Sequence, residues 1–440
     1  MNSSASREIY SNLARKIELL RGIKMSDEII NIEKPEFKTD LTERVIAVLI
    51  WPLCFLYASM LFENEGTWNI MFVVFGGAFI ILSECMYFKK KRTIESIAVL
   101  IMAVITIASV CLPGEHVFAT GQRAFFSHLF AVYWVLCRAD MLSEGETSHM
   151  MVWDGIMGFF VIPFPNFFIN IRTIITLIKT SDNDKRRKAI PAIILASFAA
   201  FILLAVAISY LMHADANYSA LMQKIGGFIK IDINEELAAK LAFTVVVSMY
   251  IYGLIGGCYR AEPDNARVRG DKIKNKLASL RKVPTKVWIV FVALFSVFYL
   301  LFFVIQGKYL INAFIMELPN GFTYSQYARK GFGDMCGVTV INFIMLWLLT
   351  RTSESSEKAV TVAGIVLNVE SLLFSLIGFL KIMMYIDAYG FTPLRLQSVW
   401  AAGVLILGCI CTSINMLTGR KTAKVWFMGS AGTLALLTVI

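Results

Sequence analysis

Residues 322–332 read Phe-Thr-Tyr-Ser-Gln-Tyr-Ala-Arg-Lys-Gly-Phe, a dense polar and aromatic patch in the C-terminal half of an otherwise apolar chain. The patch carries Arg329 and Lys330 and comes shortly before an apolar run, 335–349. A charge at the centre of a bilayer costs roughly 2.5–3.5 kcal/mol on insertion scales. The patch is therefore expected to lie at the water boundary, next to a helix that crosses the membrane.

The composition of the whole chain agrees with this interpretation. Of 440 residues, 57% are apolar and 17% are charged, whereas a soluble chain has roughly half apolar residues and about a quarter charged. The sequence therefore predicts an all-α fold, a polytopic integral membrane helical bundle. The excess of 42 basic over 32 acidic residues is explained first by membrane topology.

Long apolar runs recur along the chain. A transmembrane helix needs about 20 residues, with roughly 17–25 observed, and most of the runs reach this length. The runs are 45–62, 68–88, 94–112, 117–137, 150–178, 190–212, 237–259, 287–305, 335–349, 359–386, 394–417 and 425–440.

Lysine and arginine give the orientation, because they collect in cytoplasmic connections. The connections 63–67 and 113–116 contain neither residue. If every run but one crosses once, the basic clusters all fall on the side of the N-terminus, which is then cytoplasmic. These clusters lie in the lead 1–44 and at 89–92, 172–188, 260–286, 351–358 and 420–424.

The run 150–178 is the one that is not expected to cross the membrane once. Basic residues, which favour the cytoplasm, adjoin both of its ends, and a single crossing would put those ends on opposite sides. Pro163 and Pro165 break a helix near its middle, since proline lacks an amide donor and clashes with the preceding turn. The sequence therefore predicts about 11 transmembrane helices and one re-entrant or interfacial helical hairpin at 150–178. A re-entrant hairpin needs surrounding protein or a water-filled cavity. A surface-lying pair of amphipathic helices is the alternative.

Three parts follow from this topology. Residues 1–44 form a cytoplasmic polar lead, which contains either an amphipathic helix on anionic lipid or a helix packed on the protein's own loops. Residues 45–286 form an N-terminal membrane bundle, and residues 287–440 form a C-terminal one. The basic cytoplasmic loop 260–286 is expected to fix topology and to touch anionic lipid. No nucleic-acid partner is expected, because aromatic residues are not interleaved with its charges.

The C-terminal bundle also carries a family resemblance. The phrase Tyr-Ser-Gln-Tyr-Ala-Arg-Lys-Gly-Phe at 324–332 resembles a signature of the bacterial polytopic membrane protein family of unknown function, of the domain of unknown function 4153/4173 type. Residues 304–310 and 384–395 are similar to neighbouring phrases of that family, so the resemblance covers about 287–417. The sequence departs from the pattern at Gly333, Phe391 and Pro393. The resemblance implies a multi-pass architecture in the cell membrane and supplies no reaction.

The phrases at 324–332 and 384–395 are predicted to meet on the outer face of the membrane. Both lie in connections that face outward in the predicted topology. An arginine offers a planar fork of donors that suits phosphate or carboxylate, and tyrosine hydroxyls can supplement it. An aromatic belt at the interface is the alternative. The candidate ligand-binding residues are Tyr324, Tyr327, Arg329, Tyr385, Tyr389 and Arg395.

An intramembrane polar path is the second candidate. Glu370 lies near the middle of the run 359–386, and ionisable residues within membranes are costly and tend to be functional. Lys381 follows three helical turns later on the same face, and Tyr385 and Tyr389 continue the line. The stripe predicts a hydrophilic path or a headgroup-binding groove, with ordinary interhelical hydrogen bonding as the alternative.

Other chemistries find little support in the sequence. Hydrolase elbows, phosphate loops, dinucleotide fingerprints and zinc-helix motifs do not occur in a convincing context. The eight cysteines lie in or beside apolar runs, where thiols behave as small hydrophobes. The four histidines lack ligand spacing, and His128 is interpreted as a packing residue. Neither a metal nor a cofactor is expected.

The sequence thus favours a non-enzymatic binding, sensory or regulatory, or transport component that handles an anionic or amphiphilic ligand at the outer face. The expected partners are the lipid bilayer, an anionic lipid or envelope ligand, and another membrane protein. One alternative is an integral membrane enzyme acting on lipid or cell-envelope precursors, with Glu370 or Asp387 as general base. The other is a structural partner of another membrane protein.

Overall fold

The computed structural model describes residues 37–62, 68–178, 235–307, 323–354 and 358–440, with a few isolated positions between 307 and 323. The chain divides into a first unit, Met1–Asp40, and a second, Leu41–Ile440. The predicted lead 1–44 and the run 190–212 lie almost wholly outside the described residues. Where it is described, the second unit is all-helical apart from one isolated bridge between Val283 and Ser353.

Seven of the described helices are long and apolar enough to cross a membrane. α5 (Thr120–Ala139) has similar length but carries Arg123, His128 and Arg138, and α4 (Ile94–Ser109) and α17 (Ala423–Leu437) are shorter. The predicted number of spans, about 11, stays a prediction. The seven are α2 (Leu41–Phe62), α3 (Trp68–Met86), α10 (Glu235–Arg260), α12 (Thr285–Ile305), α14 (Tyr324–Thr352), α15 (Lys358–Tyr389) and α16 (Pro393–Thr418).

The polar patch that precedes run 335–349 is part of a helix. It forms the first turns of α14, and the helix continues without a break into the apolar run. Thr323 begins the helix: its hydroxyl accepts from the amide of Gln326, whose side chain accepts from the Thr323 amide in return. This reciprocal cap satisfies donors that a helix start leaves unpaired.

The break predicted within 150–178 is confirmed. The segment consists of α6 (Met151–Ile156), a π-helical stretch η1 (Met157–Val161), turns over 162–168, and α7 (Ile169–Ile178). These pieces are too short to cross a bilayer. Gly253 of α10 allows the turn to approach closely, because a Cβ there would lie 2.7 Å from the Pro163 carbonyl oxygen. Whether the segment enters the membrane or lies along its surface stays a prediction.

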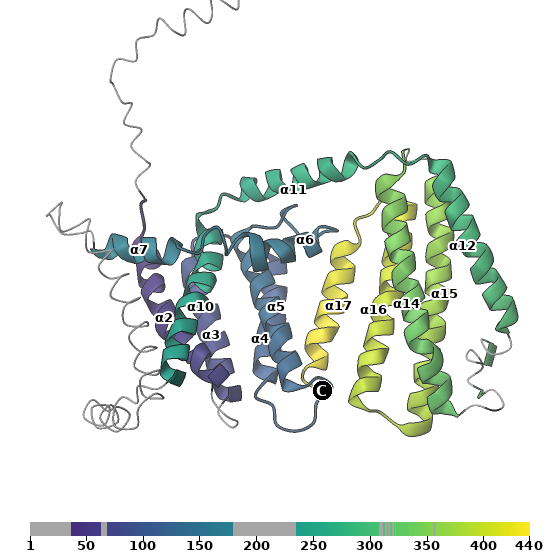
Figure 1. Ribbon diagram of the computed structural model, residues 1–440, viewed down its shortest axis with the longest axis horizontal. Helices are drawn as coiled ribbons and strands as arrows, with labels where there is room; N and C mark the ends of the chain where they lie inside the picture. The colour runs from purple at the N-terminus through teal and green to yellow at the C-terminus, as the bar shows by residue number, and fades with distance from the viewer. Residues whose placement is uncertain are drawn as a thin grey trace, which may run out of the picture. The chain divides into compact units, whose positions relative to one another are not determined.

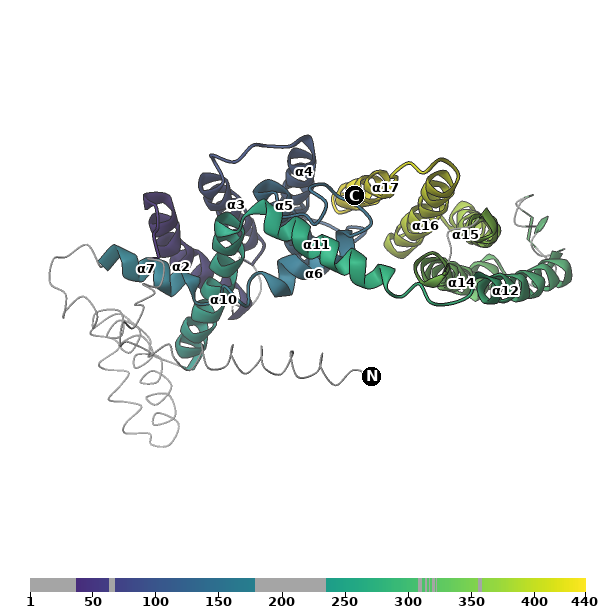
Figure 2. The same ribbon diagram turned by 90° about the horizontal axis from the view of Figure 1, so that it is seen from above.

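The segment predicted as the basic loop 260–286 is largely helical. It forms α11 (Pro263–Ala278), which starts at a proline in the first turn, where its missing amide costs nothing. α11 runs across one end of the other helices, at the ends of α5 and α6 (Figures 1 and 2). Gly270 permits this, because a Cβ there would lie 2.8 Å from the Ser143 carbonyl oxygen. Arg267 adds an ion pair with Asp140, at 3.0 Å.

Two of the hydrophobic cores in the described part of the second unit show how its helices pack. The larger lies among α2, α3, α5 and α10 and includes the fully buried Trp134 and Tyr252. The smaller joins α12, α14 and α15 around Leu349 and Leu367. The helices before α11 form a first group, and α12, α14, α15 and α16 form a second. α17 packs on α4 of the first group and on α16 of the second, and so links them. Its Phe427 ring lies 4.8 Å from the Tyr133 ring of α5.

Candidate functional site

Four of the predicted site residues lie together at one end of α14, α15 and α16. The ring of Tyr389 lies 6.3 Å from that of Tyr324 and 5.4 Å from that of Tyr385, centroid to centroid. The Arg395 guanidinium lies 3.9 Å from the Tyr385 centroid. We call Tyr324, Tyr385, Tyr389 and Arg395 the tyrosine–arginine cluster. It forms at the end of the helices opposite to α11 (Figure 1).

The turn between α15 and α16 positions this cluster. Gly390 has a φ of +76°, a left-handed conformation that glycine adopts without a steric cost. Arg395 donates from Nη1 to the carbonyl oxygens of Tyr389, at 3.0 Å, and Gly390, at 2.6 Å. These carbonyls end α15 and lack helical partners, so the arginine caps the helix and complements its dipole.

Lys381 and Tyr327 lie together beside the cluster. Lys381 is 6% exposed, and its Nζ lies 4.5 Å from the centroid of the buried Tyr327 ring. Gly331 of α14 makes room for the amine, because a Cβ at that position would lie 2.9 Å from Nζ. Among the described residues no carboxylate lies within ion-pair distance of Lys381, and Asp334 interacts with it only at longer range. The lysine is thus a buried cation whose described close partner is an aromatic face.

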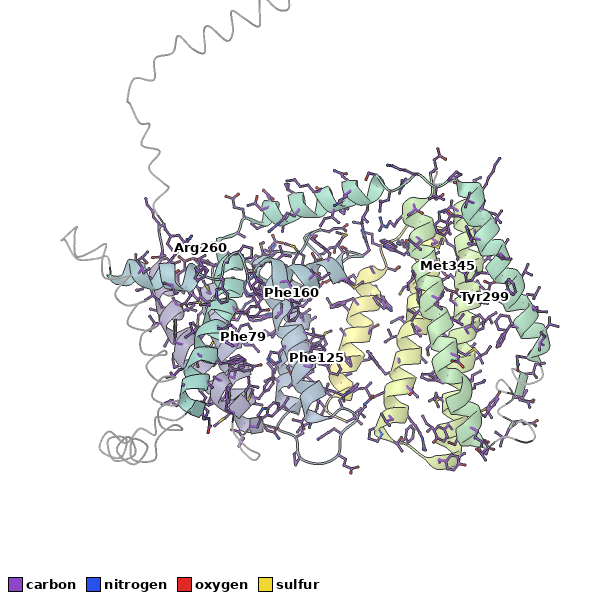
Figure 3. The ribbon with its side chains drawn as sticks, in the orientation of Figure 1. Phe79, Phe125, Phe160, Arg260, Tyr299 and Met345 are labelled. Atoms are coloured by element: carbon purple, nitrogen blue, oxygen red, sulfur yellow. The ribbon has the colours of Figure 1, made fainter. Side chains whose placement is uncertain are left out.

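Arg329 and Glu370 are the two remaining predicted residues. The side chain of Arg329 falls outside the described residues. Glu370 is half-buried on the α12 side of its helix, where Ser296 lies beside its carboxyl group. One of its oxygens is buried without a hydrogen-bond partner among the described residues. Tyr299 of α12, labelled in Figure 3, lies nearby. It donates to Asn342 of α14 at 2.7 Å. Glu370 therefore contacts α12, whereas Lys381 contacts α14.

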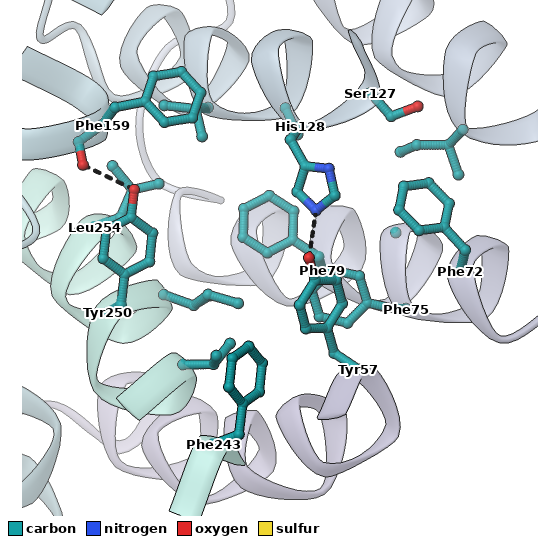
Figure 4. A pocket seen from close by; sticks show the side chains of 16 residues that line it. Tyr57, Phe72, Phe75, Phe79, Ser127, His128, Phe159, Phe243, Tyr250 and Leu254 are labelled. Atoms are coloured by element: carbon teal, nitrogen blue, oxygen red, sulfur yellow. Dashed lines mark hydrogen bonds between the residues drawn. The ribbon is translucent and has the colours of Figure 1, made fainter. Parts of the chain in front are cut away.

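A cavity in the first group of helices was not predicted. It has a volume of about 270 Å³ and lies among α2, α3, α4, α5, η1 and α10 (Figure 4). Aromatic rings supply much of its wall, among them Phe72, Phe75 and Phe79 of α3. His128 also lines it, although the sequence indicated only a packing residue. The spacing of the three phenylalanines, which puts them near one face of a helix, was the signal available in the sequence.

Comparison with protein families agrees with the position of the motif phrases. A family model described as a domain of unknown function, DUF4153, matches residues 76–440. The match covers most of the chain and includes all three phrases at 304–310, 324–332 and 384–395. The chain belongs to the DUF4153 family. No curated protein and no solved structure matches it.

The DUF4153 region also contains an ionic cluster. It lies at the same end of the helices as α11. Glu144, in the connection after α5, pairs with Lys274 of α11 at 2.7 Å and with Lys421 at 3.6 Å. Burial acts to raise the pKa of the Glu144 carboxyl, but the hydrogen bond from Lys274 and neighbouring positive charges outweigh it, so the pKa lies below its ordinary value. Glu95 pairs with Lys424 at 2.7 Å in the same way. The cluster ties α11 and the start of α17 to α4 and to the connection after α5.

Metal-binding groups are not seen in the part of the DUF4153 chain that the structure describes. No set of three or more histidine, cysteine, aspartate or glutamate side chains there could hold a metal ion. The arrangement instead offers a buried cation, tyrosines that pack edge to face and an arginine at one helix end. These groups suit recognition of a negatively charged group.

Proposed function

We propose that this DUF4153 protein is a multi-pass protein of the cell membrane that binds an anionic amphiphile at the outer face. It acts as a non-enzymatic binding, sensory or transport component. The observation that carries the proposal is the buried Lys381 amine, which has no ion-pairing carboxylate among the described residues. A buried charge is costly unless it is paired, and an anionic ligand would supply the pairing.

The membrane setting is supported by the exposed faces of the helices. α12 has the highest mean hydropathy of the seven long helices. Only 6% of its most apolar stretch is buried against the rest of the protein. Val290, Val297, Leu300 and Val304 on this helix are all more than half exposed. Apolar faces of this extent are stable against lipid tails and are rarely left in water.

The sidedness is supported by charge. α11 and the connection 87–93 lie at one end of the helices (Figure 1) and carry many of the described lysines and arginines. The positive-inside rule places that end in the cytoplasm. The tyrosine–arginine cluster and Lys381 then lie near the outer surface, and the N-terminus is cytoplasmic.

The amphiphilic character of the ligand is inferred from the rim of the site. Tyr389 is 53% exposed, and Phe391 and Leu394, on the same turn, are exposed to an even greater degree. Apolar side chains at the helix end, about two turns from the buried cation, favour a molecule with a negatively charged headgroup and a hydrocarbon tail. A small water-soluble anion would leave these side chains uncovered.

The test measures binding of a lipid phosphate to the full chain in phosphatidylcholine nanodiscs. Dilauroyl phosphatidic acid is titrated against wild type, Lys381→Met and Lys240→Met. Lys240 is a matched control, because it also lies at the outer end of its helix but is paired with Glu236 at 2.7 Å. A hydrogen bond to a charged group contributes about 1.5–3 kcal/mol, so Lys381→Met should weaken binding by roughly 10- to 150-fold. Lys240→Met should stay within about twofold.

Equal affinity of wild type and Lys381→Met, with normal expression and folding, would refute the proposal. Weakening by both lysine substitutions to the same extent would also contradict it, because the lipid would then respond only to the net charge of the outer face.

A further inference from the structure

We infer that the cavity among α2, α3, α4, α5, η1 and α10 is a second binding site, which takes a neutral, mainly apolar molecule that carries one hydroxyl group. This inference does not depend on the anion site. It rests on the size of the cavity, on the chemistry of its wall, and on the hydrogen bonds that its polar atoms already make.

The size of the cavity suits a small ring system. It measures about 270 Å³, and an apolar cavity of roughly 150 Å³ is known to stay dry and to bind benzene. The space therefore accommodates about two fused aromatic rings or a hydrocarbon segment of equal volume. It is slightly smaller than typical small-molecule sites, which measure about 300–1,000 Å³.

The wall of the cavity excludes charged ligands. None of the 16 residues that line it is aspartate, glutamate, lysine or arginine. The rings of Phe72, Phe75, Phe79 and Phe243 supply flat apolar surface. A carboxylate or an ammonium group would lose its hydration there without finding a partner of opposite charge, which costs several kcal/mol.

The hydrogen bonds at His128 fix its proton. Nδ1 lies 2.7 Å from the Ala124 carbonyl oxygen, which can only accept, so Nδ1 carries the hydrogen. In the neutral ring Nε2 is then an acceptor. The Tyr57 hydroxyl, at 3.2 Å, therefore donates to it.

The other two hydroxyl groups among the lining residues also donate their hydrogens to acceptors within the protein. The Tyr250 hydroxyl donates to the Phe159 carbonyl oxygen at 2.8 Å, and the Ser127 hydroxyl donates to the Arg123 carbonyl oxygen at 2.8 Å. Tyr57 and Tyr250 lie on opposite sides of the cavity (Figure 4). Each of the two tyrosine hydroxyl oxygens has used its hydrogen and keeps a lone pair.

A complementary ligand must therefore donate a hydrogen bond. An alcohol or a phenol does so without carrying charge, whereas a hydrocarbon leaves the lone pairs unused. The chemical class that fits the size of the cavity, its uncharged wall and its unused acceptors is a neutral alcohol, with either a ring system or a prenyl chain as its apolar part. Such a molecule can reach the cavity from the lipid phase, because the surrounding helices include α2, α3 and α10, which are apolar enough to cross a membrane.

The test uses three probes of equal ring size on the full chain in nanodiscs: naphthalene, 2-naphthol and 2-naphthoate. Probe fluorescence is titrated, and the signal of empty nanodiscs is subtracted. One hydrogen bond contributes about 0.5–1.5 kcal/mol, so 2-naphthol should bind roughly 2- to 13-fold more tightly than naphthalene. 2-Naphthoate should show no saturable binding to the cavity.

Two substitutions that fill the cavity keep the test specific. Ala131→Leu and Val247→Phe, each on a lining residue, should weaken 2-naphthol binding at least about tenfold. Ala401→Leu on α16, outside the cavity, should leave it unchanged. Circular dichroism selects the variants that fold, and either filling variant suffices.

The inference is overturned if a folded filling variant binds 2-naphthol as the wild type does, or if 2-naphthoate binds as tightly as 2-naphthol. Lys381→Met should leave 2-naphthol binding intact, so a failure here is distinguishable from a failure of the anion site.

Discussion

The Arg395 guanidinium lies 3.9 Å from the centroid of the Tyr385 ring while it donates to the two carbonyl oxygens that end α15. An arginine that the sequence indicated as a ligand group is therefore held by its own turn. Stacking on an aromatic face and capping of a helix end both fix a planar guanidinium. Arg395 thereby locks the turn on which Tyr389 is displayed.

Arg395→Ala is expected to lower the free energy of unfolding by about 1–2 kcal/mol, because it removes both the stacking and the cap. Arg395→Lys should recover only part of the loss, since an ammonium group lacks the planar fork. Thermal unfolding of the detergent-solubilised chain measures the effect. A normal melting temperature together with lost lipid binding would instead make Arg395 a ligand group.

Gly331→Ala should displace the Lys381 amine, because the new Cβ would lie 2.9 Å from Nζ. The lysine end is flexible, and alanine is favoured over glycine in a helix by about 1 kcal/mol, so stability should not fall. Binding of phosphatidic acid should weaken several-fold. Gly333→Ala is the control, since a Cβ there meets nothing within 4 Å; equal binding by the two variants would exclude a role for the amine's position.

The helices were predictable because their apolar runs are long. Ten of the twelve runs each correspond to a single helix, and proline chemistry located the break at 162–168. α11 was not predicted, because the segment 260–286 was interpreted from its charge alone. The ion pair of Arg267 and the close approach at Gly270 hold this helix against the connection after α5. Charge patterning indicates the side of a membrane and does not reveal this packing.

The candidate site was predictable only in part. Periodicity predicts Glu370 and Lys381 on the same face of α15, but it cannot tell which helix each side chain meets. Glu370 faces α12 and Lys381 faces α14. The cavity at His128 was missed for the same reason, because its wall is assembled from helices far apart in the sequence. Which helices pack against each other depends on the tertiary structure, and the apolar pattern of one segment does not reveal it.

Arg138→Ala should be among the most destabilising single changes in the chain. Arg138 is 2% exposed and donates to Glu84 and to the carbonyl oxygens of Tyr87 and Lys90. Removing it leaves buried acceptors without donors, at a cost of about 3–5 kcal/mol. Arg92→Ala is the matched control, because Arg92 pairs with the same carboxylate from an exposed position and should cost less than about 1 kcal/mol. Similar losses in chemical unfolding would contradict this difference.

The ionic cluster around Glu144 should make stability depend on acid. The pKa of Glu144 in the folded protein lies below its ordinary value of 4.5, so its contribution is fully present above about pH 4.5 and is lost as the pH falls through the folded pKa. Glu144→Gln should lower the melting temperature at pH 7 and show a smaller further decrease between pH 5 and pH 3. Parallel pH curves for wild type and variant would show that other carboxylates govern the acid response.

The sidedness of the molecule can be read from cysteine labelling in intact cells. The naturally exposed Cys85 and Cys111 are first replaced by serine. Gln326→Cys and Ala388→Cys then report on the two motif phrases, and Asn275→Cys reports on α11; all three positions are exposed. A membrane-impermeant maleimide should label the first two in intact cells.

Asn275→Cys should react only after permeabilisation, because the basic residues around it favour the cytoplasm. The two phrase positions lie at the end of the helices opposite to α11, so they must respond together (Figure 1). Labelling of Asn275→Cys from outside, with Gln326→Cys protected, would invert the orientation. It would also move the proposed anion site to the cytoplasmic leaflet while leaving its geometry unchanged.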